Sequence, residues 1–474
     1  MAWLSLKNKT KKELKFALVL SGGGARGAYE AGVMYYLRTK MPKEIAESDL
    51  FKIYSGTSVG AINTAFLSAT AEDPLYQGAE LRKLWQGLRD KDIYRTDYQA
   101  LTGFLVRSGF FMASQFFGLG HMLEKKLDPG ADHPPFPFKS ILDTTPFVYF
   151  LRRNVAWDKI HRNIQRGILD AATISATHMM SGQLALFVEK NERLEYRRGG
   201  PQPTFCSLSP KHVLASAAIP LVFPIIRINR EFYGDGSLRQ NTPMSPAIHM
   251  GANRILVIST HYHKAHRPAP GSPLSAYTSE PALGDILGTL LDSLFMDKLE
   301  YDLEQMKRIN YLIDDFEDLF GADALDKVNK RRSKIKGLGK EIHEMNRIVP
   351  FVISPSQDIG TLASQHFQRL LSSREKLTPM QKFFSRVVEG TPDDHNDLVS
   401  YLLFDGDYLE DLLQLGFEDA AREHDHLVNF FSGLPIEPKP TDWDEPLIEN
   451  EEIEEETAEK VLPKPKKKRP APKA

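Results

Sequence analysis

Cysteine is almost absent from the 474-residue sequence. The single cysteine, Cys206, excludes an intramolecular disulfide bond and fits a reducing compartment. The sequence also lacks a run of about 18 apolar residues, the length that a membrane-spanning helix needs. Residues 1–15 are basic but contain no apolar stretch long enough for the core of a signal peptide. We therefore expect a cytoplasmic protein, and peripheral contact with a membrane surface remains compatible with this sequence.

An excess of positive charge is missing too. The 60 Lys and Arg residues are balanced by 62 Asp and Glu residues, which gives a formal net charge of -2. Because no global positive field attracts phosphates, nucleic acid is excluded as the main partner. The hydrophobic share of 42% is ordinary for a globular protein, and the chain is long enough to bury a large core.

Short apolar segments alternate with helical segments in the first 280 residues. Residues 15–20 ("KFALVL") and 51–55 ("FKIYS") are typical of buried strands, and each precedes a tight glycine turn and a helix. This alternation predicts an α/β fold with a mostly parallel sheet covered by helices. The expected strands are 15–20, 51–55, 168–177, 184–189, 224–229, 254–260 and 351–354, and the expected helices are 28–40, 59–69, 209–219 and 245–250.

The pattern changes beyond about residue 280. Residues 283–316 and most segments from 360 to 432 have apolar residues at helical spacing. From residue 436 an acidic block and a basic, proline-rich block follow, and neither buries enough apolar surface to fold alone. The expected units are an N-terminal segment (1–14), an α/β domain (15–280), a mostly helical extension (281–435) and a disordered charged tail (436–474).

The glycine-rich turn "SGGGARGAYEAG" (21–32) allows two interpretations. Gly22, Gly24 and Gly27 fit the G-x-G-x-x-G pattern of dinucleotide-binding oxidoreductases. That pattern requires an acidic residue at the end of the second strand to hold the ribose. Here the second strand ends in "YSGTSVG", and Asp49 lies before it. The dinucleotide interpretation therefore lacks a required residue.

The alternative interpretation of this turn is an anion site. Gly22, Gly23 and Gly24 let the backbone approach a ligand closely, and their N–H groups lie beside a helix N-terminus. Such a site stabilises the oxyanion of an acyl-transfer intermediate. Arg26 adds a positive charge beside it.

The second glycine turn, "GTSVG" (56–60), places Ser58 between Gly56 and Gly60. In G-x-S-x-G, the glycines relieve the strain of a sharp strand-to-helix elbow that presents a nucleophilic serine. The turn follows an expected strand and precedes the expected helix 59–69, as that mechanism demands. A glycine-flanked helix cap made by Ser58 or its neighbour Thr57 is the alternative.

A nucleophilic serine needs a base. His261, His263 and His266 follow an expected strand in "STHYHKAHRP", but their loop is typical of a surface, and no carboxylate lies close in sequence to complete a metal site. Asp235 in "YGDGS" lies between two glycines after an expected β-hairpin. These glycines let the chain turn sharply and bring the carboxylate close to another backbone.

The motifs G-G-G-A-R-G (22–27), G-T-S-V-G (56–60) and D-G-S (235–237), in this order, resemble those of the patatin-like phospholipase family. The segment "ASAAIPLVFP" (215–224) is also similar to the one that precedes the family's aspartate. The resemblance covers roughly residues 15–260. Bacterial members of the family often carry a C-terminal helical extension similar to the one expected here.

This resemblance implies a three-layer patatin-like fold and a serine acyl hydrolase that acts on lipid esters without a cofactor or a metal. It makes Ser58 the nucleophile and Asp235 its base in a Ser–Asp dyad that forms an acyl-enzyme. Ser237 departs from the family pattern, where glycine or alanine is common. The residues that match the family's oxyanion-hole motif are Gly22, Gly23, Gly24 and Arg26.

A catalytically silent lipid-binding or scaffolding protein with the same fold remains an alternative to the hydrolase, besides the oxidoreductase. Residues 101–123, rich in phenylalanine and glycine, fit either a loop that caps the core or a mobile apolar lid that admits lipid chains. The lipid head group, the acyl position and the oligomeric state are left open by the sequence.

Overall fold

The computed structural model describes residues 14–95, 140, 142–196, 202–262, 299–332, 334, 345–372, 377–378, 381–382 and 397–435. The segment 101–123, expected to be either a capping loop or a lid, lies outside the described residues, as do the charged tail at 436–474, His263 and His266. Only the part of the expected helix at 283–316 from residue 299 on is described.

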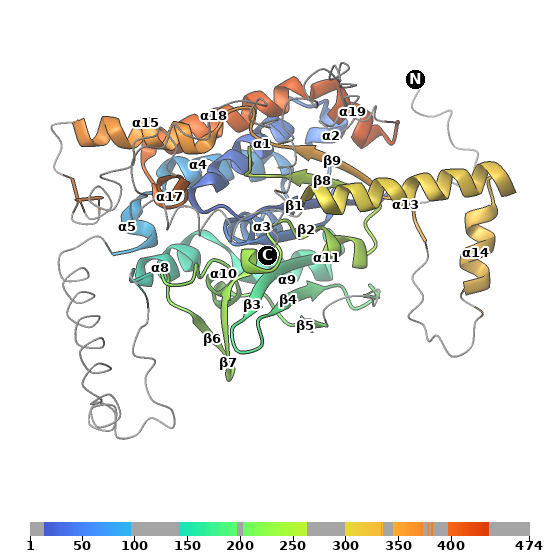
Figure 1. Cartoon of the computed structure of the whole chain (residues 1–474), viewed down its shortest axis with the longest axis horizontal. Helices are drawn as coiled ribbons and strands as arrows, with labels where there is room; N and C mark the ends of the chain where they lie inside the picture. The colour runs from blue at the N-terminus through green and yellow to red at the C-terminus, as the bar shows by residue number, and fades with distance from the viewer. Residues whose placement is uncertain are drawn as a thin grey trace, which may run out of the picture.

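A sheet of nine strands lies at the centre of the described structure (Figure 1). Its main path runs β5-β4-β3-β2-β1-β8-β9, and β3, β2, β1, β8 and β9 are parallel to one another. Strand β4 pairs antiparallel with β3, and the β6–β7 hairpin joins the sheet where β7 pairs antiparallel with β3. The strands are β1 Phe16–Leu20, β2 Phe51–Thr57, β3 Ala171–His178, β4 Gln183–Lys190, β5 Pro203–Phe205, β6 Ile226–Ile228, β7 Glu231–Asp235, β8 Arg254–Ile258 and β9 Val349–Ile353.

Helices cover both faces of the sheet, because its central strands are apolar on both sides. In β1, Leu18 and Leu20 pack into one core with α1, α3 and α18, whereas Ala17 and Val19 pack into a second core with α11 and α13. The α-helices are α1 Gly27–Thr39, α2 Lys43–Ala46, α3 Val59–Ala69, α4 Pro74–Gly87, α5 Asp90–Ile93, α8 Thr145–Asn154, α9 Trp157–Gln165, α10 Pro210–Ser216, α11 Met244–His249, α13 Leu299–Phe320, α14 Ala324–Arg332, α15 Ile359–Ser372, α17 Asp397–Leu402, α18 Gly406–Arg422 and α19 His424–Ser432.

The three-layer α/β fold expected from the sequence is confirmed. Each of the seven expected strands is present, with ends displaced by up to three residues. The helix at 59–69 has the expected bounds. Strand β5 and helices α4, α8 and α9 were not expected. Among the described residues, no helix is both long enough and apolar enough to cross a membrane.

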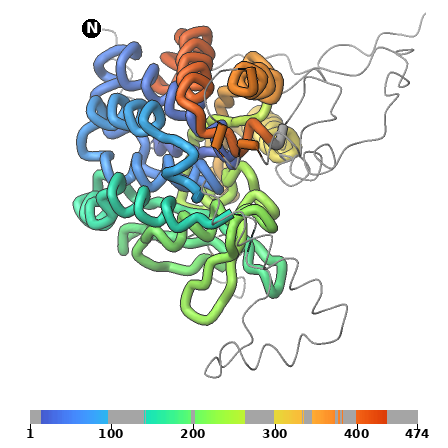
Figure 2. The backbone as a smooth tube through the Cα atoms, turned by 90° about the vertical axis from the view of Figure 1, so that its left-hand side faces the viewer, coloured from blue at the N-terminus to red at the C-terminus, as the bar shows by residue number. Residues whose placement is uncertain are grey.

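The C-terminal extension shares its core with the α/β domain. Strand β9, which corresponds to the expected strand at 351–354, belongs to this extension and continues the sheet beside β8. Helix α18 runs along α1 (Figure 2). The ring of Phe16 in β1 lies 5.6 Å from that of Phe430 and 5.5 Å from that of Phe431, both in α19. The expected boundary at residues 280/281 therefore does not separate two independent cores.

Candidate active site

Ser58 occupies the tight turn between β2 and α3. Its backbone has φ 53° and ψ -119°, a conformation that costs a non-glycine residue about 1–3 kcal/mol. The flanking glycines are required by close packing. A Cβ atom on Gly60 would lie 2.3 Å from the Leu20 carbonyl oxygen, and one on Gly56 would lie 2.2 Å from the Gly60 carbonyl oxygen. The sequence G-x-S-x-G thus forms a strained elbow.

The Ser58 hydroxyl donates a hydrogen bond of 2.8 Å to Oδ2 of Asp235, 177 residues along the chain. Both residues are buried, with 2% and 1% of their surface exposed. Strand β7 brings the carboxylate to this place, because it ends at Asp235 and pairs there with Ala176 of β3, the strand beside β2. A serine and an aspartate that are distant in sequence therefore form one buried pair.

The surrounding backbone orients the Asp235 carboxylate. The Ser237 N–H donates to Oδ1 over 2.8 Å, while the Thr177 hydroxyl donates to the Asp235 carbonyl oxygen over 2.7 Å. Burial raises the pKa of Asp235 to about 6, although the hydrogen bonds from the Ser237 N–H and the Ser58 hydroxyl favour the charged form. A carboxylate with this pKa accepts a proton near neutral pH more readily than an ordinary aspartate does.

A second serine holds the backbone of the elbow. The Ser58 N–H donates to the Ser216 hydroxyl over 2.8 Å, and that hydroxyl donates to the Ser175 carbonyl oxygen over 2.5 Å. Ser216 lies at the C-terminal end of α10, within the quoted segment "ASAAIPLVFP", but no local pattern assigns it this contact. Ser216 thus ties the nucleophile to β3.

The first glycine turn lies against the elbow. A Cβ atom on Gly22 would lie 3.2 Å from Cβ of Ser58 and 2.3 Å from the Ser237 hydroxyl. Gly24 has φ 57°, which favours glycine. The Gly22 N–H is already used, since it donates to the Asn241 carbonyl oxygen over 3.2 Å.

Unlike the Gly22 N–H, the next three N–H groups of this turn are not used in hydrogen bonds between described residues. Those of Gly23, Gly24 and Ala25 donate to no acceptor within the described part of the chain. They follow one another at the N-terminal end of the 3-10 helix Gly24–Arg26, which leads directly into α1. Successive N–H groups without a partner at a helix N-terminus are able to bind an anion. Of the expected oxyanion-hole residues, Gly23 and Gly24 thus have free donors, and Gly22 supplies close packing.

The Arg26 side chain binds the C-terminal extension. Its guanidinium donates to the Ser400 hydroxyl from Nε over 2.9 Å and from Nη2 over 2.6 Å, and its Cζ lies 4.1 Å from the centre of the Tyr401 ring. A Cβ atom on Gly24 would lie 2.2 Å from the Tyr401 carbonyl oxygen. Helix α17 therefore packs directly on the glycine turn, a contact that no pattern in the sequence indicates.

The expected histidine cluster is described only at His261, whose N–H donates to the Ser259 hydroxyl over 3.2 Å after the end of β8. Within the residues that the structure describes, no group of three or more His, Cys, Asp or Glu side chains is placed to hold a metal ion.

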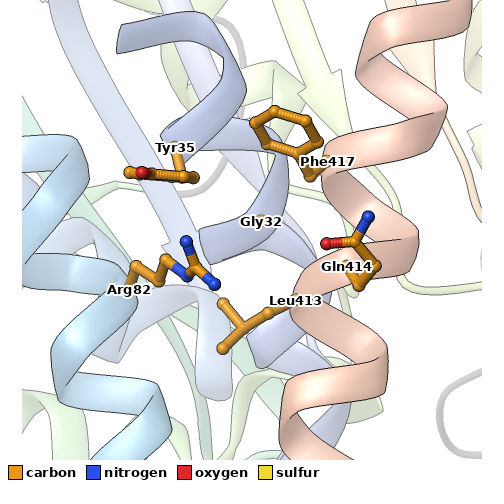
Figure 3. Close-up of a pocket in the computed structure, with 6 residues that line it drawn as sticks. All are labelled: Gly32, Tyr35, Arg82, Leu413, Gln414 and Phe417. Carbon is orange, nitrogen blue, oxygen red and sulfur yellow. The ribbon is translucent and has the colours of Figure 1, made fainter. Parts of the chain in front are cut away.

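A small cavity of about 70 Å³ lies between α1, α4 and α18 (Figure 3). Its charged lining residue, Arg82, is paired with Glu410 over 2.9 Å and lies over the Tyr35 ring. The cavity is therefore a gap between packed helices, and neither Ser58 nor Asp235 lines it. The lining residues are Gly32, Tyr35, Arg82, Leu413, Gln414 and Phe417.

Comparison with known proteins relates the part of the chain that carries this site to one family. The family model described as "Patatin-like phospholipase" matches residues 18–248, a range that includes Ser58 and Asp235. Comparison with curated proteins yields no match. Among solved structures, the chain is similar to VipD from Legionella pneumophila, with 12% identity over 85% of this chain and 67% of the VipD chain. The TM-score is 0.26.

Proposed function

We propose that this chain is a serine hydrolase that cleaves fatty-acyl ester bonds of lipids, and the match of residues 18–248 to the patatin-like phospholipase family model supports this proposal. The observation that carries the proposal is the buried hydrogen bond of 2.8 Å between the Ser58 hydroxyl and Asp235 Oδ2 at a strained elbow. A plain turn needs neither a positive φ at serine nor a buried carboxylate beside it.

In the first step, the Ser58 oxygen attacks the ester carbonyl carbon while its proton moves to Asp235. The resulting tetrahedral intermediate collapses as the bond from the carbonyl carbon to the alcohol oxygen breaks. Asp235 then returns the proton to the leaving alcohol, and an acyl-enzyme remains. A water molecule then attacks the acyl carbon of this ester while one of its protons moves to Asp235. The bond from the acyl carbon to the Ser58 oxygen breaks, Asp235 returns the proton to Ser58, and the fatty acid leaves.

The N–H groups of Gly23, Gly24 and Ala25 hold the oxyanion in this proposal. Donors of this kind contribute several kcal/mol when they are aimed at the charge that develops in the transition state. The N-terminus of α3 adds a favourable dipole at Ser58. Arg26 acts indirectly, because its hydrogen bonds to Ser400 hold the turn in position.

The proposal is tested by covalent labelling with a fluorophosphonate probe, followed by analysis of the products from a panel of phospholipids and neutral glycerides. Wild-type protein is expected to react at Ser58 and to release fatty acid, and Ser58→Ala is expected to do neither. Ser181→Ala, which changes an exposed serine in the turn between β3 and β4, is the matched control and is expected to retain both.

Folded wild-type protein that neither reacts with the probe nor hydrolyses any ester of the panel contradicts the proposal. If such protein binds lipid vesicles, the catalytically silent lipid-binding alternative replaces the hydrolase. Release of fatty acid by Ser58→Ala would show that another group is the nucleophile.

A further inference from the structure

Asn241 carries a buried amide group that the mechanism given above does not use. The residue is 4% exposed, and neither Oδ1 nor Nδ2 of its side chain has a hydrogen-bond partner among the described residues. A buried amide without partners destabilises a fold, because its donor and its acceptor have both lost their hydrogen bonds to water. Such a group calls for an explanation other than packing, and a molecule that is bound during the reaction supplies one.

The Asn241 amide lies beside the nucleophile. A Cβ atom on Gly22 would lie 3.2 Å from Cβ of Ser58. The same point lies 2.4 Å from Asn241 Oδ1 and 2.3 Å from the Ser237 hydroxyl oxygen, so the three side chains meet there. Ser237 connects this place to the base, since its N–H donates to Asp235 Oδ1 over 2.8 Å. The unused amide thus belongs to the surroundings of the Ser58–Asp235 pair.

Hydrogen bonds of the backbone hold Asn241 in this position. Its own carbonyl oxygen accepts from the Gly22 N–H over 3.2 Å. The carbonyl oxygen of the preceding residue, Gln240, accepts from the Thr57 hydroxyl over 2.9 Å. The segment is therefore joined to both glycine turns, and the place of the Asn241 side chain does not depend on a hydrogen bond of its own amide.

Hydrolysis of an acyl-enzyme gives an amide oxygen at this place a chemical use. Once Ser58 is acylated, its oxygen no longer has a proton to donate, so Asp235 Oδ2 becomes available to the attacking water. Asp235 Oδ1 still accepts from the Ser237 N–H. The carboxylate thus offers one oxygen to a molecule that has two protons. A second acceptor is needed to hold the other proton and to keep the water oxygen directed at the acyl carbon.

We propose that the Asn241 amide oxygen is this second acceptor and that it orients the water which hydrolyses the acyl-enzyme. The water oxygen forms a bond to the acyl carbon while one proton moves to Asp235, and the other proton remains hydrogen-bonded to Asn241. The bond from the acyl carbon to the Ser58 oxygen then breaks, Asp235 returns its proton to Ser58, and the other proton leaves on the fatty acid. This role rests on the proposed ester hydrolysis and concerns deacylation alone.

The test separates formation of the acyl-enzyme from its hydrolysis. Wild type, Asn241→Leu and Asn241→Ala are each mixed with the p-nitrophenyl ester of a fatty acid, and nitrophenol release and the mass of the intact protein are followed in time. Both variants are expected to acylate at about the wild-type rate and to deacylate at least about tenfold more slowly, because the water is no longer oriented. They should show a burst of nitrophenol and accumulate protein acylated at Ser58.

Chemical rescue distinguishes this role from a structural one. Hydroxylamine is a stronger nucleophile than water, so it is expected to release the acyl group from both variants and to restore turnover. Both variants should stay folded, which thermal unfolding checks, since no hydrogen bond between described residues depends on the amide. Asn154→Ala is the control. It removes an amide that donates to the Phe150 carbonyl oxygen in α8, and it should leave both rates unchanged.

The outcomes distinguish this inference from the proposed function. If wild type turns over the ester and folded variants deacylate at the wild-type rate, the inference is overturned while the proposed function stands. Equal slowing of acylation and deacylation also overturns it, because the amide would then act on substrate binding or on the shape of the site. Wild type that neither forms an acyl-enzyme nor releases fatty acid overturns both.

Discussion

The Arg26 guanidinium donates two hydrogen bonds to the Ser400 hydroxyl, across 374 residues of chain. The arginine and the serine are both buried, and the Tyr401 ring lies against the guanidinium. Arg26 ends the turn that carries the free N–H groups of Gly23 and Gly24. The C-terminal extension therefore supports the turn that is proposed to stabilise the oxyanion.

Ser400→Ala is expected to lower kcat for ester hydrolysis about tenfold, because loss of a hydrogen-bond partner of a buried charge costs about 1.5–3 kcal/mol. KM should change little, since the acyl chain does not bind through Ser400 in this mechanism. Steady-state kinetics on a soluble ester measures both. Ser400→Thr keeps the hydroxyl and is expected to restore most of kcat. Equal kcat for wild type and a folded Ser400→Ala protein would remove Arg26 and Ser400 from the mechanism.

The pH profile of hydrolysis should report the Asp235 carboxyl. Since Asp235 must be ionised to accept the Ser58 proton, and since its pKa is raised to about 6, kcat/KM is expected to rise with pH and to level off above about pH 6. Release of fatty acid from an uncharged ester, followed at constant ionic strength, gives the profile. Asp158→Asn, an exposed change on α9, should leave it unaltered. A profile that levels off near pH 4 would contradict a role for buried Asp235.

Asp235→Asn is expected to abolish hydrolysis and to stabilise the fold at pH 8. The raised pKa means that the native state binds the proton more tightly than the unfolded state, so the free energy of unfolding falls as pH rises from about 4 to about 6. The loss amounts to about 3 kcal/mol, and asparagine avoids it because it carries no charge. Urea unfolding at pH 8 and pH 4 is the measurement. The difference between variant and wild type should be large at pH 8 and small at pH 4; the reverse order would refute the explanation.

Gly60→Ala is expected to disrupt the elbow. Its Cβ would lie 2.3 Å from the Leu20 carbonyl oxygen and 2.7 Å from that of Ser21, and backbone atoms of a central strand cannot move away cheaply. A loss of about 1–3 kcal/mol or more in the free energy of unfolding, with loss of activity, should follow. Gly87→Ala is the matched control, because a Cβ there meets nothing within 4 Å. Similar stability of both variants would show that Gly60 is not constrained.

Local patterns in the sequence predicted most of the sheet. Strands β1, β2 and β8 are short apolar runs, and the elbow at Ser58 follows from glycine spacing between a strand and a helix. Strand β5 was missed because it has only three residues, of which one is proline. Helix α9 was missed because charged residues interrupt its apolar spacing, and α8 was missed because it is a short segment with a proline in its first turn. The glycine-flanked turn made Asp235 a candidate base, and the resemblance to a family assigned it the partner role in a dyad with Ser58.

Sequence alone established the α/β class, the two glycine turns and the nucleophile candidate, because each depends on residues within one strand, turn or helix. Three features depended on the folded chain. Strand β7 had to pair with β3 before Asp235 reached Ser58, β9 had to join the sheet beside β8, and α17 had to pack on the turn before Arg26 found Ser400. Hydrogen bonding and apolar periodicity encode an element locally, whereas contacts between distant elements arise only when their buried faces pack together.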